Sequence, residues 1–69
     1  MKEVKITTEF IKLSALLKWI GAVSTGSEAK DLIAGGKVSV NGQVEMQRGK
    51  KIFKGNIVEI EGTGAFKIG

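Results

Sequence analysis

The sequence contains no cysteine and no histidine among its 69 residues. Without cysteine, the chain can form neither a disulfide framework nor a thiolate metal site, so packing alone must hold the fold. Without histidine, it lacks the commonest general base and the commonest metal ligand. An enzyme built on this chain would depend on Asp, Glu, Lys or Ser. We therefore expect a non-enzymatic protein with no metal and no cofactor.

Long apolar runs are also missing, and the longest is only a few residues, far short of a membrane span. The chain starts Met-Lys-Glu-Val, which does not resemble the charged and then apolar start of a signal peptide. We therefore expect a cytoplasmic protein with no membrane partner.

The chain does have the composition of a small globular domain, with more basic than acidic residues. Its length suits one domain, residues 1–69, with a small core. Apolar residues make up 42% and charged residues 26%, as in ordinary soluble domains. Eleven basic residues against seven acidic ones give a net charge of +4. This charge favours an acidic partner, although similar charges occur on proteins that bind nothing acidic.

The first half of the chain has a strand pattern followed by a helical one. Val4 and Ile6 alternate with polar residues, which predicts a short N-terminal strand. A helical apolar face follows at Leu13, Leu16, Leu17 and Ile20. Gly21 suits the left-handed position that ends a helix. Lys12, Ala15 and Trp19 would lie on a neighbouring stripe of this helix.

Trp19 allows two interpretations. Nucleic-acid-binding proteins use exposed aromatic side chains as stacking platforms. Large aromatic side chains also dominate core energetics in small domains. We favour the second interpretation, in which Trp19 closes one edge of the core.

A second short helix is predicted between Thr25 and the pair Gly35-Gly36. Thr25 and Glu28 have the spacing of a capping box, in which each side chain bonds the other's backbone amide. An apolar face at Ala29, Leu32 and Ile33 would dock on the first helix, because so short a helix is unstable alone. Gly26 and Ser27 in the first turn could seat a phosphate, although such a start more commonly begins a helix and nothing more.

The second half of the chain reads as strands and turns. Val38 and Val40 alternate with polar residues, and Asn41-Gly42 is a strong hairpin signal before Val44 and Met46. Further strands are expected over residues 57–60 and, at the sheet edge, over residues 65–68. Together these patterns predict an α+β fold in which two short packed helices lie against a small, twisted, antiparallel sheet of three to five strands.

The segment 47–54 has four cations and no acid, namely Arg48, Lys50, Lys51 and Lys54. These cations repel one another, so folding gains nothing from gathering them. A solvated loop that protects a sheet edge is one explanation. We favour a phosphate-binding rim in which Arg48 binds bidentately and the lysines act as point charges, extended by Lys30 and Lys37.

No arrangement of residues suggests catalysis or a small-molecule substrate. Glu28 is better used as a capping residue, and the glycines form neither a phosphate-binding loop nor a dinucleotide motif. Ser27 has no activating base, because the chain has no histidine.

Four segments together resemble the S4 RNA-binding domain, also described as the alpha-L RNA-binding motif. They are Leu13–Gly21, Ser27–Ile33, Gly36–Gly42 with its terminal Val-Asn-Gly, and Lys54–Ile60. The resemblance covers residues 10–61, the motif core, and the chain is similar to small stand-alone bacterial members. It differs at Gly26, where many members have arginine.

The resemblance implies a monomer that binds structured RNA, such as ribosomal RNA or the ribosome, in ribosome assembly or translation. The alternative is a protein-interaction adaptor whose basic face meets an acidic protein. The RNA-binding candidates are Ser27, Lys30, Lys37, Arg48, Lys50 and Lys51. Secondary candidates are Lys12, Lys18, Thr25, Gly26, Asn41 and Lys54.

Overall fold

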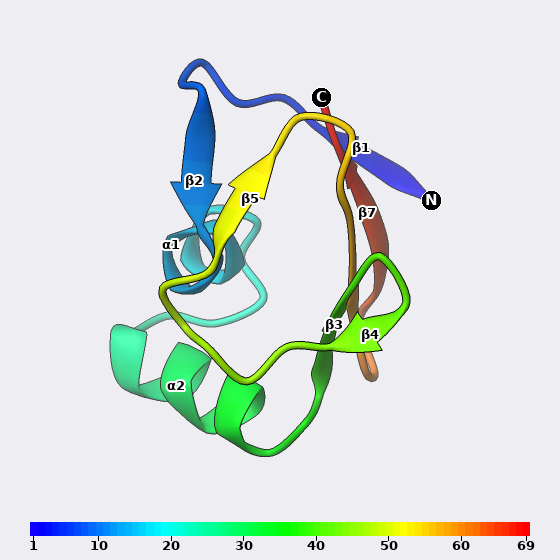
Figure 1. Cartoon of the computed structure of the whole chain (residues 1–69). Coiled ribbons are helices and arrows are strands. Elements are labelled where there is room, and N and C mark those ends of the chain that lie inside the picture. Colours follow the sequence, from blue (N-terminus) through cyan, green and yellow to red (C-terminus); the bar gives the residue numbers. More distant parts are fainter.

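The computed structural model describes residues 1–69 as two helices, a five-stranded sheet and a separate two-stranded ribbon (Figure 1). In chain order the elements are β1 (Lys2–Val4), β2 (Phe10–Lys12), α1 (Leu13–Trp19), α2 (Gly26–Ala34), β3 (Val38–Val40), β4 (Gln43–Val44), β5 (Lys51–Phe53), β6 (Ile57–Ile60) and β7 (Gly64–Ile68). The predicted combination of two packed helices and a small, mostly antiparallel sheet is therefore confirmed.

The helices bury the faces that their periodicity predicts. Leu16 and Leu17 of α1 are fully buried, as are Ala29 and Ile33 of α2, and all four belong to one apolar core. The helices have only seven and nine residues, so this packing, and not helix propensity, holds them. Gly21 ends α1 with a φ of 78°, in the left-handed region that favours glycine.

The cap of α2 differs from the prediction in one bond. The Thr25 Oγ1 atom accepts a hydrogen bond from the Glu28 backbone N–H at 3.2 Å, as expected. The Glu28 carboxylate, however, accepts from the backbone N–H of Ser24 at 3.0 Å, one residue before the expected partner. Two of the otherwise unpaired donors at the helix start are still satisfied.

The five-stranded sheet has the order β1-β7-β6-β3-β4. Asn41 and Gly42 both have positive φ, 51° and 86°, which is the hairpin geometry that this dipeptide predicts between β3 and β4. The predicted edge position of the last strand is wrong, because β1 pairs with β7 in parallel and leaves it inside the sheet. The first strand also lies earlier than Val4 and Ile6 indicated, and Ile6 is buried just beyond it.

The ribbon of β2 and β5 is the element that periodicity missed. Phe10 pairs with Phe53, Ile11 with Ile52, and Lys12 with Lys51. Ile52 is fully buried in the core and Ile11 packs against it, which fixes the ribbon to the domain. Lys12 therefore belongs to a strand and not to the helical stripe that we expected.

The expectation for Trp19 is also wrong. Trp19 is 53% exposed and lies outside the core cluster, to which α1 contributes its buried leucines, Leu13, Leu16 and Leu17. Neither helix has the length and apolar character needed to cross a membrane.

Candidate nucleic-acid interface

The basic segment before β5 is fixed against the start of α1 by two backbone hydrogen bonds. The N–H of Leu13 donates to the carbonyl of Lys50 at 2.9 Å, and the N–H of Ser14 donates to that of Arg48 at 3.0 Å. The first N–H groups of a helix have no partner within it, and no side chain caps α1. The segment supplies the missing acceptors, so the position of Arg48 is set by main-chain geometry.

This anchoring creates a hollow of about 420 Å³ beside the start of α2. Its lining has three cations, two hydroxyl groups and one glycine, but no apolar side chain and no carboxylate; these residues are Ser14, Lys18, Gly26, Ser27, Lys30 and Arg48. We call it the basic hollow. Nothing in its lining neutralises the three cations, so the hollow favours an anion.

The backbone of α2 adds to this positive character. Gly26 and Ser27 are the first two residues of the helix, and their N–H groups have no acceptor within the protein. The N-terminal end of a helix carries a partial positive charge and binds phosphate groups well. The basic hollow therefore combines side-chain cations with free backbone donors.

A second group of cations lies on the ribbon and beside it. Lys12 and Lys51 are directly opposite each other on β2 and β5, and the Nζ atom of Lys51 lies 4.8 Å from the centroid of the Phe10 ring. Like charges in opposite positions destabilise a strand pair. Lys50 and Lys51 also line a groove of about 310 Å³ between the ribbon and the β3–β4 hairpin, which we call the polar groove.

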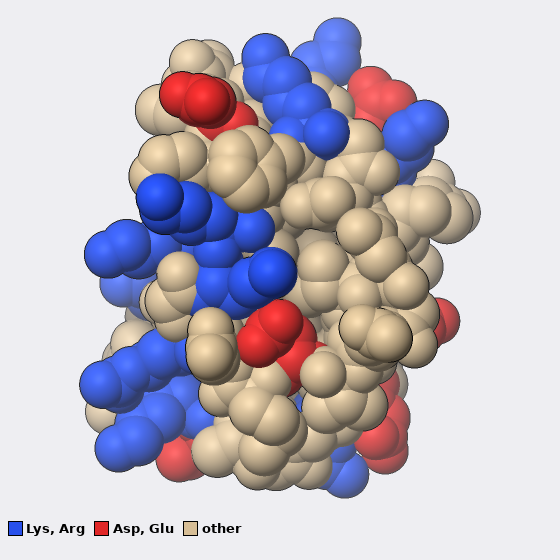
Figure 2. Space-filling model, in the orientation of Figure 1, with Lys and Arg blue, Asp and Glu red and all other residues tan.

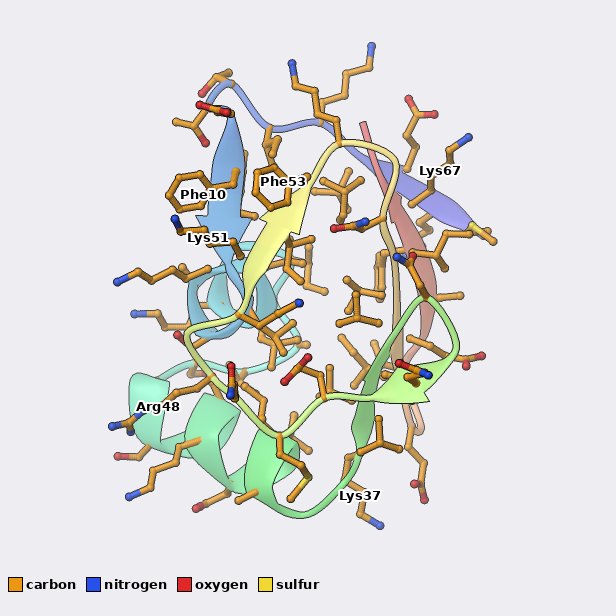
Figure 3. The ribbon with its side chains drawn as sticks, viewed as in Figure 1. Phe10, Lys37, Arg48, Lys51, Phe53 and Lys67 are labelled. Atoms are coloured by element: carbon orange, nitrogen blue, oxygen red, sulfur yellow. The ribbon has the colours of Figure 1, made fainter.

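The two groups form one basic face. Figure 2 shows Lys and Arg atoms gathered on the left of the view, over β2, β5 and the start of α2, where Asp and Glu atoms are few. Figure 3 shows Arg48 beside the start of α2 and Lys51 next to Phe10 on the same side of the molecule. Of the predicted residues, the structure brings together Ser27, Lys30 and Arg48, with Lys50 and Lys51 further along this face.

Lys37 lies apart from the other main candidates. It follows the end of α2, where its Nζ atom forms an ion pair with the Glu61 Oε1 atom at 3.4 Å. Figure 3 shows it at the opposite end of α2 from Arg48.

Among the secondary candidates, Lys18 and Gly26 line the basic hollow, and Lys12 lies on the ribbon. Thr25 and Asn41 make structural hydrogen bonds, in which they accept from the backbone N–H groups of Glu28 and Ile57 respectively. Thr25 accepts at Oγ1 and Asn41 at Oδ1. Lys54 is exposed in the turn after β5.

Sequence reasoning missed Ser14, Phe10 and Phe53 as residues of this face. No local pattern indicates Ser14, because only the pairing of segment 48–50 with α1 brings it into the hollow. A signal did exist for the phenylalanines. The tripeptide Phe-Ile-Lys at 10–12 returns in reverse order as Lys-Ile-Phe at 51–53, which is what an antiparallel pair with matched residues requires.

The fold is that of a known class of domain. The family model described as the S4 domain matches residues 4–68, and the chain belongs to this family. It is similar to the probable ribosome maturation protein RlbA of Bacillus subtilis, with 37% identity over 65 residues that cover 94% of this chain and 92% of that one. The family prediction is thus confirmed.

A solved structure agrees. The solution structure of YbcJ from E. coli, described as revealing an alfaL motif involved in RNA-binding, superposes with a TM-score of 0.73 at 32% identity. The match covers 99% of this chain and 86% of YbcJ. The predicted S4-like architecture is therefore confirmed at the level of the whole chain.

Proposed function

We propose that this protein is a non-enzymatic, monomeric RNA-binding protein of the cytoplasm that recognises structured ribosomal RNA during ribosome assembly or translation. The basic hollow is the observation that carries the proposal, since three cations and two free backbone N–H groups meet there without a carboxylate. The relatives support it, because one is named as a probable ribosome maturation protein and the other is described with a motif involved in RNA-binding.

In this proposal the protein reads phosphate positions and RNA shape. Arg48 binds a phosphate bidentately, while Lys18 and Lys30 act as point charges around the N–H groups of Gly26 and Ser27. Lys12, Lys50 and Lys51 continue the contact along the ribbon. Structured RNA is recognised largely through such backbone contacts, because its deep major groove is closed to side chains. Lys37, Thr25 and Lys54 contribute least to the contact.

The test is the triple charge reversal Arg48→Glu/Lys50→Glu/Lys51→Glu. All three side chains are exposed, so we expect an unchanged circular dichroism spectrum and a nearly unchanged melting temperature. Binding to labelled ribosomal RNA should fall below detection in a fluorescence anisotropy titration, because phosphate contacts dominate the affinity. A folded triple variant that still binds this RNA like the natural protein would contradict the assigned face.

Treatment of a native pull-down with ribonuclease separates this proposal from a protein adaptor. Loss of the captured partners on digestion supports RNA binding. Partners that survive digestion, but are lost from the triple variant, would instead show that the basic face binds an acidic protein. Crosslinking followed by sequencing of the bound RNA then identifies the target.

A further inference from the structure

The outer face of the ribbon carries two aromatic rings, next to two lysines of like charge that lie opposite each other. Phe10 and Phe53 lie directly opposite, with ring centroids 5.8 Å apart and ring planes at 48°. Phe53 is 42% exposed and Phe10 is half-buried. Figure 3 shows the two rings side by side at the surface, with Lys51 next to Phe10.

The inner face of the ribbon, and not this outer face, packs into the core. Ile52, on the opposite face of β5, is fully buried and already anchors the ribbon. Lys12 and Lys51 stand on the outer face in opposite positions, where their repulsion destabilises the pair. The rings of Phe10 and Phe53 thus form an apolar patch beside the cations Lys12 and Lys51. Aromatic side chains beside cations are the elements with which proteins bind unpaired bases.

We propose that Phe10 and Phe53 form a platform on which one unpaired base of the bound RNA stacks, with Lys12 and Lys51 on the phosphates that flank it. The proposal rests on the proposed function and adds a feature of the RNA, an unstacked nucleotide beside the paired region held at the basic hollow. The occupant follows from charge complementarity and from continuity, since Lys51 of the platform follows the segment Arg48–Lys50, whose carbonyls at 48 and 50 are bonded to the start of α1 and whose Arg48 side chain lines the basic hollow.

The polar groove next to Phe53 offers suitable donors for the edge of such a base. Asn41 and Asn56 line the groove, and each uses its Oδ1 atom to accept a backbone N–H at 2.8 Å, from Ile57 and Phe53 respectively. Their Nδ2 groups remain as donors without a partner in the protein. The one carboxylate of the groove, Glu45, already accepts from the Gln47 N–H at 3.0 Å. The two Nδ2 groups can therefore donate to acceptor atoms of a base or a ribose.

The experiment compares three RNA duplexes of one sequence in fluorescence anisotropy titrations. One has a single bulged adenosine, the second has an abasic nucleotide at the bulge, and the third has no bulge. We expect the natural protein to bind the adenosine bulge about tenfold more tightly than the abasic one, which is within the range of one base–aromatic stack. Phe10→Leu and Phe53→Leu should lose this preference but keep the affinity for the abasic duplex, because leucine retains apolar packing without a ring.

Trp19→Leu is the matched control, since it removes another exposed aromatic side chain that lies off the ribbon. We expect this variant to keep the full preference for adenosine. In proton NMR spectra, the adenosine-bulged duplex should shift the ring protons of Phe10 and Phe53 upfield and leave those of Phe66, which is buried, in place. Melting curves of each variant confirm that it is folded.

Three outcomes would overturn the platform. They are equal affinity of the natural protein for the adenosine and abasic bulges, an unchanged preference in folded Phe53→Leu, and a preference lost in Trp19→Leu alone. In each of these cases the duplexes still bind, so the proposed function stands. Failure to bind any of the three duplexes, at low salt, would contradict the proposed function and the platform with it.

Discussion

Two polar hollows of similar size lie at the two ends of α2, and they differ in how their cations are paired. The basic hollow, of about 420 Å³, lies beside the start of the helix and has three cations and no carboxylate. The other hollow, of about 460 Å³, begins just after the end of the helix and holds one cation, Lys37, with the carboxylates of Glu59 and Glu61. We call it the Lys37 hollow.

The helix dipole makes this difference informative. The end of a helix carries a partial negative charge, so Lys37 stands where a cation stabilises the fold, and Glu61 neutralises it further. Arg48 stands beside the positive end of the same helix, where a cation is unfavourable to the fold. Arg48 is thus a cation that neither the helix nor an acidic residue of the hollow stabilises, which indicates that it binds an anion from outside the protein. Position relative to the fold is therefore more informative here than the total charge of the chain.

Charge reversal in the basic hollow should have the largest effect. We expect Lys30→Glu/Arg48→Glu to lower the affinity for ribosomal RNA by roughly 100-fold or more, because each lost charge-assisted hydrogen bond contributes about 1.5–3 kcal/mol. The free energy of unfolding should stay the same or rise slightly, since the reversal places negative charge near the positive end of α2. Anisotropy titrations over a series of salt concentrations, with urea denaturation alongside, measure both quantities.

The matched control is Lys37→Glu/Lys67→Glu, which changes the net charge by the same amount on the other side of the molecule. Lys37 lines the Lys37 hollow and Lys67 is exposed on β7, and Figure 3 shows both away from Arg48. We expect the control to weaken binding by no more than about threefold, through long-range electrostatics alone. Equal losses in the two double variants would mean that only net charge matters, and the comparison of the two hollows would fail.

Gly26→Pro should have the next largest effect, because it removes one backbone donor of the basic hollow and no charge. Proline is well suited to the first position of a helix, and Thr25 before it is already extended, with φ −133° and ψ 163°. A Cβ atom at Gly26 would meet no atom within 4 Å. We therefore expect unchanged or slightly raised stability, but an RNA affinity lower by about tenfold, the low end of the value of one hydrogen bond to a charged group.

Gly26→Arg is the opposite change at the same position. The open space around Gly26 accommodates a side chain, and the added guanidinium would reach a phosphate in the hollow. We expect a steeper salt dependence, by about 0.7–0.9 in the slope of log K against log salt for one added contact. Tighter binding in Gly26→Pro, or no change in slope in Gly26→Arg, would show that the phosphate lies elsewhere.

The sequence predicted the helices and most strands because these features are set locally. The period of the leucines, the Thr25–Glu28 cap and the positive φ at Asn41-Gly42 each depend on neighbours in the chain. The ribbon escaped prediction, since its strands have three residues each and take their identity from a partner about forty positions away. The inner position of β7 likewise depends on β1, at the other end of the chain.

The basic face shows the same limit. The cations of segment 48–51 were visible in the sequence as a cluster, but their division between the basic hollow and the ribbon depends on the carbonyls of Arg48 and Lys50 meeting the start of α1. Lys37 appeared equivalent to Lys30 in the sequence, and only the sheet brings Glu61 to it. Trp19 was expected to close one edge of the core because of its size, yet it is 53% exposed and lies outside the core cluster.

Removal of the Lys37 ion pair should have the smallest effect, and it tests the other half of the comparison. The two side chains are 47% and 68% exposed, and exposed ion pairs contribute between zero and about 1 kcal/mol, screened further by salt. We expect a double-mutant cycle of Lys37→Ala and Glu61→Ala, followed by urea denaturation, to give a coupling free energy of at most about 0.5 kcal/mol. Each variant should bind ribosomal RNA within about twofold of the natural protein, as expected for a contact outside the interface. A tenfold loss of RNA affinity in Lys37→Ala, with Glu61→Ala unaffected, would mean that the RNA extends past the end of α2. The presence of a nearby acid would then no longer distinguish the cations that stabilise this fold from the cations that bind RNA.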